Sequence, residues 1–127
     1  MSTFPVERAA HLIAQPEHQK WLVEDLWLEE GVGIIGGEPK CCKSFLGLQM
    51  AVSVASGRSL FKRFGVQRPG AVLLYAAEDA LHMVRHRLER LAVYVGVHFE
   101  SLDVQVITAP SLRLDHLSDR ERLKRTV

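Results

Sequence analysis

The residues with the clearest chemical potential lie at positions 36 to 44, which read GGEPKCCKS. Backbone N–H groups of a glycine-rich loop can surround phosphate oxygens, and the N-terminus of a following helix adds partial positive charge. Lys43 supplies a full charge for the outer phosphates, and the Ser44 hydroxyl can ligate a magnesium ion that bridges them. The spacing therefore predicts a phosphate-binding loop. Its candidate ligand-binding residues are Gly36, Gly37, Glu38, Pro39, Lys40, Cys41, Cys42, Lys43 and Ser44.

One residue departs from the G-x-x-x-x-G-K-S pattern of such loops. Counting from Gly37 places Cys42 where the pattern has its second glycine. Glycine suits that position because the backbone approaches the phosphates closely and because φ can be positive, which costs other residues about 1–2 kcal/mol. If φ is positive at Cys42, and if the resulting strain acts only on binding, we expect the affinity of the loop for its phosphate ligand to fall by about tenfold. The alternative is a tight strand-to-helix turn with an incidental Lys-Ser pair.

A second group of candidate residues is the acidic pair Glu78-Asp79, which directly follows the apolar run AVLLYAA. Ligands of open parallel sheets bind at the carboxyl ends of the strands, so Glu78 is placed to orient and deprotonate an attacking water. The candidate catalytic residues are therefore Glu78 and Lys43. The alternative is structural, with Asp79 as the N-cap of the next helix, and both roles are compatible.

The chain around these residues alternates between short apolar runs and longer helical segments. The short runs are typical of strands in a parallel sheet, and we predict them at residues 32–35, 71–77 and 104–107. The predicted helices span residues 43–56, 80–94 and 118–125. Gly57 is expected to end the first, and Ser118 with Glu121 to form a capping box on the last. This order predicts an α/β fold with a parallel sheet and flanking helices.

Three further segments are less regular. Residues 6–15 have apolar positions at helical spacing and predict a short amphipathic helix closed by Pro16. Residues 19–31 fit a strand, a turn or a short helix, and we expect them to pack against the core. Residues 58–70 mix basic side chains with glycine and proline, which predicts a surface connection.

The composition of the chain is informative about the kind of domain and the compartment in which we expect it. The chain has 127 residues, 47% of them hydrophobic, and a formal net charge of +1, which is ordinary for one soluble domain. It has neither a signal-peptide core nor eighteen consecutive apolar residues, so we expect no membrane association. Cys41 and Cys42 are adjacent, too close for an ordinary structural disulfide, which fits a reducing compartment. We therefore expect a cytoplasmic protein.

Basic side chains at residues 85–90 and in a run near the end of the chain allow a further interpretation. Arg85, Arg87, Arg90 and the run RERLKR are able to contact the phosphates of DNA. Acidic residues are interleaved with them, and we favour the alternative of a solvated helix face.

At the level of whole motifs, the chain resembles the RecA-like AAA ATPases of the RepA replicative-helicase type. The resemblance rests on GGEPKCCKS followed by a helix and on GAVLLYAAEDALHMVRHRLERLA. The segment WLVEDLWLEEGVGIIGG is also similar to the part that precedes the loop in that family, so residues 20–95 are covered. The family is a P-loop NTPase group.

The resemblance implies a ligand, a metal and partners. It implies a Walker A-like loop that binds ATP with Mg²⁺ through Gly37, Lys43 and Ser44, and a glutamate at Glu78 that activates water. The match extends to Asp79 and to the pair Arg87-Leu88. Family members are hexameric or oligomeric motors of DNA replication and mobile elements, which implies a homo-oligomer and DNA as partners.

The chain also departs from the family pattern. The family has glycine at position 42, and it has a later Walker B strand that ends in aspartate. The late acidic residues of this chain follow no run of four apolar residues; they are Asp115, Asp119 and Glu121. We therefore expect an N-terminal segment over residues 1–30 and, over 31–127, the N-terminal half of a RecA-like ATP-binding domain, with an incomplete sheet of about three core strands.

These departures leave two functions open. ATPase activity is implied by the resemblance, whereas hydrolysis by this chain alone is in doubt without a Walker B aspartate. The rival hypothesis is a degenerate, non-catalytic P-loop remnant that acts as an interaction module.

Overall fold

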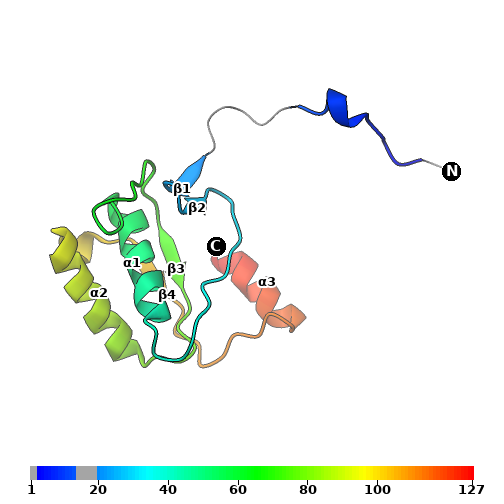
Figure 1. Ribbon diagram of the computed structural model, residues 1–127. Coiled ribbons are helices and arrows are strands. Elements are labelled where there is room, and N and C mark those ends of the chain that lie inside the picture. Colours follow the sequence, from blue (N-terminus) through cyan, green and yellow to red (C-terminus); the bar gives the residue numbers. More distant parts are fainter. Residues whose placement is uncertain (1–2, 14–19) are drawn as a thin grey trace.

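The computed structural model describes residues 3–13 and 20–127. The described chain forms a mixed α/β structure in which two helices lie on one side of a strand pair and a third lies on the other (Figure 1). In chain order the elements are η1 (Ala9–His11), β1 (Trp21–Val23), β2 (Trp27–Leu28), α1 (Lys43–Ser56), β3 (Val72–Leu74), α2 (Leu81–Val95), η2 (Phe99–Ser101), β4 (Val104–Val106) and α3 (Leu117–Thr126).

The strand pair β3–β4 is parallel and is connected through α2, as the alternating sequence predicts. Its register pairs Val72 with Val104 and Leu74 with Val106. Leu74 and Val104 pack against the cluster that α1 and α2 form, whose buried members are Leu48, Val52, Val84 and Leu88. One face of the strand pair is therefore covered by these two helices.

Helix α1 agrees with its prediction at both ends. It begins at Lys43 and ends at Ser56, and Gly57 follows in the left-handed conformation, with φ of 75°. The Gly57 N–H donates to the Ser53 carbonyl at 2.8 Å, which satisfies a carbonyl of the last turn. Helix α2 likewise ends before Gly96, with φ of 78°.

The segment that the sequence left ambiguous, residues 19–31, contains an antiparallel hairpin in its described part. Strands β1 and β2 pair, and Val23 of β1 is fully buried. Val23 forms a second cluster with Val54 and Leu60. The expectation that this segment packs against the core is confirmed.

The strand predicted at residues 32–35 does not form. These residues have no partner strand within the described part of the chain, and Val32 and Ile34 are almost completely exposed. The path is held instead by Trp27, whose Nε1–H donates to the Gly31 carbonyl at 3.2 Å. A Cβ at Gly33 would lie 2.5 Å from the same indole ring, so the backbone passes close against it. The described parallel sheet thus has two strands rather than about three.

The helix predicted at residues 6–15 is also wrong within its described part. Only one 3-10 turn forms, at Ala9–His11, and residues 14 and 15 lie outside the described residues. None of its side chains is buried, and an isolated helix of this length is marginal in water.

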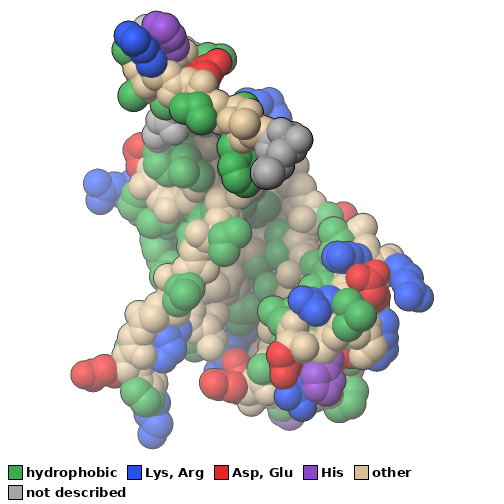
Figure 2. Space-filling view, turned by 90° about the vertical axis from the view of Figure 1, so that its right-hand side faces the viewer, with side chains coloured by type: hydrophobic (Ala, Val, Ile, Leu, Met, Phe, Trp, Pro, Cys, Tyr) green, Lys and Arg blue, Asp and Glu red, His purple; other side chains and the backbone are tan. Residues whose placement is uncertain are grey.

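Helix α3 forms at its predicted place but without the predicted capping box. His116 precedes its first turn without a side-chain cap, and Asp119 instead accepts the Arg113 backbone N–H at 2.9 Å. None of its residues is buried, and charged side chains gather over this region (Figure 2). None of the helices in residues 3–13 and 20–127 has both the length and the apolar composition needed to cross a membrane.

Candidate functional site

The loop at residues 36–44 leads directly into the first turn of α1. The Cys41 N–H donates to the Glu38 carbonyl at 3.3 Å, which closes a turn ahead of the helix. A Cβ at Gly37 would lie 2.5 Å from the Cys41 sulfur, so a side chain there requires the Cys41 thiol to rotate away. The glycine at the start of the pattern thus lets the Cys41 side chain pack against the loop backbone.

The Lys43 side chain folds back over the loop. Its Nζ donates to the Gly37 carbonyl at 2.8 Å and to the Glu38 carbonyl at 3.1 Å. These bonds place a positive charge beside the loop and next to the N-terminus of α1. Both features favour an anion at the same place.

Cys42 occupies the left-handed region, with φ of 68° and ψ of 25°. The positive φ considered for this residue is therefore present in the folded loop itself. Its side chain makes no capping hydrogen bond to α1, so the conformation has no local compensation from the thiol. Because glycine adopts this conformation without a Cβ penalty, Cys42 strains the folded loop.

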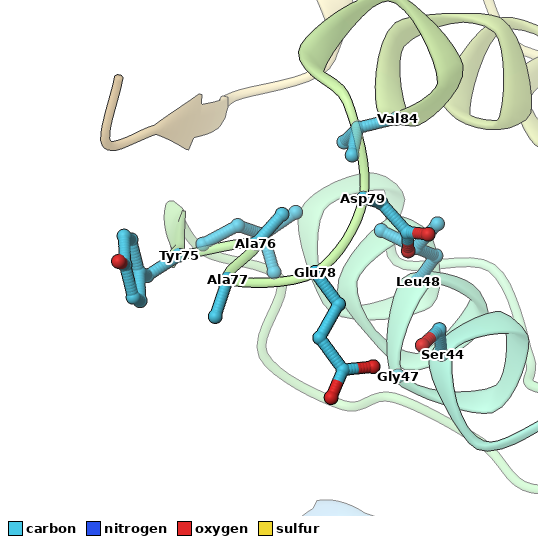
Figure 3. A pocket seen from close by; sticks show the side chains of 10 residues that line it. Ser44, Gly47, Leu48, Tyr75, Ala76, Ala77, Glu78, Asp79 and Val84 are labelled. Atoms are coloured by element: carbon cyan, nitrogen blue, oxygen red, sulfur yellow. The ribbon is translucent and has the colours of Figure 1, made fainter. Parts of the chain in front are cut away.

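A hollow lies between α1 and the end of β3, with a volume of about 310 Å³. Ser44 and Gly47 line it from the first five residues of α1, and Glu78 lines it from the segment after β3. The Glu78 side chain points toward the turn that carries Ser44 (Figure 3). The fold thus brings together two of the predicted site residues that are 34 positions apart, by the numbering of the sequence.

Two side chains that line the hollow, Ser44 and Glu78, carry oxygen atoms of the kind that bind a hydrated magnesium ion. Mg²⁺ prefers oxygen ligands, keeps several waters and is usually held by few protein groups together with substrate phosphates. The Ser44 hydroxyl and the Glu78 carboxylate are both suitable, and both line the same hollow. No group of three His, Cys, Asp or Glu side chains suited to a metal occurs within the described residues.

Asp79 does not cap α2, so the alternative role considered for it is wrong. The N-cap position is Ala80, and it makes no side-chain capping bond. The Asp79 carboxylate instead accepts from Arg87 Nη1 at 3.0 Å. The two residues are eight positions apart in the sequence, a spacing that no local pairing rule of helices covers.

Phe45 also belongs to this region, which its place in the sequence does not indicate. The Arg87 guanidinium lies 4.7 Å from the centre of the Phe45 ring, which is close enough for a cation–π contact. An aromatic residue inside an apolar helix is predicted to lie in the core, so only the tertiary structure shows that Phe45 contacts Arg87.

Comparison with known proteins gives one positive result. A family model described as AAA domain matches residues 2–127. No curated protein and no solved structure matches the chain.

Proposed function

The chain belongs to the AAA domain family, and from this premise we propose that it binds ATP through the loop at residues 36–44. Nucleotide binding of the ATPase type is the general function that family membership supports. The observation that carries the specific proposal is the position of Lys43. Its ammonium is held over the loop by two carbonyls, directly beside the N-terminus of the 14-residue helix α1.

In this proposal each group binds a different part of ATP and its magnesium ion. The loop N–H groups and the N-terminus of α1 receive the phosphates, and Lys43 exchanges its carbonyl partners for phosphate oxygens. The Ser44 hydroxyl holds the magnesium ion that accompanies ATP. Glu78, on the opposite side of the hollow, orients the water that attacks the terminal phosphate.

A finer proposal concerns the kind of ATPase. The motifs at residues 20–95 support a motor of the RepA replicative-helicase type, which assembles as a homo-oligomer, in that family a hexamer, and acts on DNA. The described arginines support DNA contact only weakly, since Arg85 pairs with Glu89 at 2.7 Å. Analytical ultracentrifugation of the chain with ATP tests the oligomeric part of this proposal.

A second candidate function is an interaction module that has lost nucleotide binding. The strained backbone of Cys42 favours it, because the substituted position lies inside the proposed phosphate loop. The two candidates differ in a single measurable property, which is the affinity for nucleotide.

Calorimetric titration with ATP, ADP and AMP in the presence of magnesium tests the proposed function. We expect ATP and ADP to release heat on binding and AMP to bind far more weakly, because AMP lacks the phosphates that Lys43 and the loop contact. Absence of heat with all three nucleotides would contradict the proposal and favour the interaction module.

Replacing Cys42 with glycine is expected to relieve about 1–2 kcal/mol of backbone strain. Because Cys42 is left-handed in the folded loop itself, most of this relief is expected as greater stability of the folded chain, and a gain of about tenfold in ATP affinity is the upper limit. Strain that is relieved in the free loop appears as a higher urea midpoint of unfolding, which urea titration measures. Strain that is relieved only on binding appears as a higher affinity for ATP, which calorimetry measures.

Cys42→Ala is the matched control, because it removes the thiol and keeps the Cβ atom that causes the strain. We expect no gain from this variant in either measurement. Equal behaviour of Cys42→Gly and Cys42→Ala would show that the left-handed backbone of Cys42 has no consequence for the loop.

A further inference from the structure

Arg87 of α2 joins two segments that are far apart in the sequence. Its Nη1 donates to the Asp79 carboxylate at 3.0 Å, and its guanidinium lies over the Phe45 ring at 4.7 Å from the ring centre. Phe45 belongs to the first turn of α1, and Asp79 lies in the segment between β3 and α2. The side chain of Arg87 therefore connects all three parts.

Both partners of Arg87 are sequence neighbours of proposed site residues. Phe45 directly follows Ser44, and Asp79 directly follows Glu78 and itself lines the hollow between α1 and β3. Ser44 and Glu78 line the same 310 Å³ hollow, in which the Glu78 side chain points toward the first turn of α1 (Figure 3). Arg87 thus contacts a residue directly beside each of these two groups.

The contacts of Arg87 are suited to holding a fixed geometry. The Arg87 side chain is 21% exposed and that of Asp79 is 32% exposed, so the pair is less screened by water than the exposed pairs of the chain. A guanidinium is planar and can stack on a ring while it donates to a carboxylate, which a lysine ammonium cannot reproduce. The ion pair and the stacking contact restrain the same side chain.

We propose that Arg87 is a positioning residue for the hollow between α1 and β3, setting the Glu78 carboxylate against the Ser44 hydroxyl. The residue does not itself line the hollow, and it acts through Phe45 and Asp79. This proposal rests on the proposed function, because the geometry that Arg87 sets is that of the magnesium-binding part of the ATP site.

The proposal predicts which part of nucleotide binding depends on Arg87. Lys43 and the loop N–H groups hold phosphates without help from α2, so binding of metal-free ATP is expected to be independent of Arg87. Besides orienting the attacking water, Glu78 is placed in this proposal to accept from a magnesium-bound water across the hollow from Ser44, so the magnesium-dependent gain in affinity depends on the separation of the two groups. Loss of residues that orient metal ligands typically lowers metal affinity by about 10- to 100-fold.

The experiment is calorimetry of the full chain with a non-hydrolysable ATP analogue, once with magnesium and once with EDTA. We expect Arg87→Gln to reduce the magnesium-dependent gain by about tenfold while the affinity in EDTA stays as in wild type. Asp79→Asn removes the charge that Arg87 pairs with, and because Asp79 itself lines the hollow, it is expected to reduce the gain at least as much as Arg87→Gln.

Arg85→Gln is the matched control on the same helix. Arg85 also makes one ion pair and one stacking contact, with Glu89 at 2.7 Å and over Phe99 at 5.1 Å from the ring centre, but neither partner lines the hollow. We expect this variant to keep the full magnesium-dependent gain. An equal loss in Arg85→Gln and Arg87→Gln would overturn the proposal, because the effect would then be a general one of α2.

The remaining outcomes are also decisive. A full magnesium-dependent gain in Arg87→Gln overturns the positioning role and leaves the proposed function intact, whereas absence of binding by wild type overturns both. If Arg87→Gln fails to fold, Arg87→Lys replaces it, and this variant is expected to show a partial loss of the gain because it keeps the charge and loses the stacked plane. Adding Arg87→Gln to Glu78→Gln should cause no further loss if Arg87 acts through Glu78, and an additive loss contradicts that route.

Discussion

Replacing Lys43 with alanine is expected to lower the affinity for ATP by about a hundredfold. The ammonium contacts two loop carbonyls, and on binding it would contact phosphate oxygens in charge-assisted hydrogen bonds. Loss of hydrogen bonds to charged groups costs about 1.5–3 kcal/mol, which reaches a hundredfold in affinity at its upper end. Isothermal titration calorimetry with ATP and magnesium measures this difference directly.

Lys40→Ala is the control for this prediction, because Lys40 carries the same charge three residues earlier in the same exposed loop. Its removal changes the net charge equally but leaves the contacts between Lys43 and the loop carbonyls in place. We expect its effect on affinity to be much smaller. Equal losses in the two variants would mean that ATP responds only to the general charge of the loop, which would contradict a specific role for Lys43.

The local parts of the site were predictable from the sequence. The bounds of α1 follow from the apolar run after Lys43 and from Gly57, because helix formation and helix ends depend on residues within a few positions of each other. The positive φ of Cys42 was also foreseen as a condition, since a pattern that normally has glycine marks a backbone position with special demands.

The parts that depend on distant contacts were not predictable. Residues 32–35 are rich in β-branched and glycine residues, but a strand needs a partner, and within the described chain Trp27 and not a neighbouring strand determines their path. The pairing of Asp79 with Arg87 is missed for a similar reason. Capping preferences describe Asp79 in isolation, whereas the observed partner lies two turns into α2.

The segment at residues 58–70 shows how composition can hide a core residue. Its basic side chains, glycines and proline predict a surface connection, yet Leu60 is only 1% exposed. The Leu60 N–H donates to the Phe64 carbonyl at 2.8 Å, and Phe61 and Lys62 between them both have positive φ. This turn carries backbone strain, and the burial of Leu60 is the interaction that opposes it.

Replacing Leu60 with alanine is therefore expected to destabilise the chain by about 2–5 kcal/mol, which is the usual range for truncating a buried leucine. Leu60 packs with Val23 of β1 and Val54 of α1, so its loss opens a cavity between the hairpin and the helix that carries the proposed site. The free energy of unfolding from urea titration measures the effect, and it is a large fraction of the 5–15 kcal/mol typical of whole domains.

Leu114→Ala is the matched control, since Leu114 is 61% exposed and the same truncation there is expected to change the free energy of unfolding by no more than about 0.5 kcal/mol. Leu60→Met keeps most of the volume and should cost less than about 1.5 kcal/mol, which gives a measurable variant if Leu60→Ala is unfolded. Equal effects of Leu60→Ala and Leu114→Ala would show that the segment at residues 58–70 is a surface connection after all. A loss confined to Leu60→Ala would establish it as part of the core that supports α1, and through α1 the loop that ends in Lys43 and Ser44.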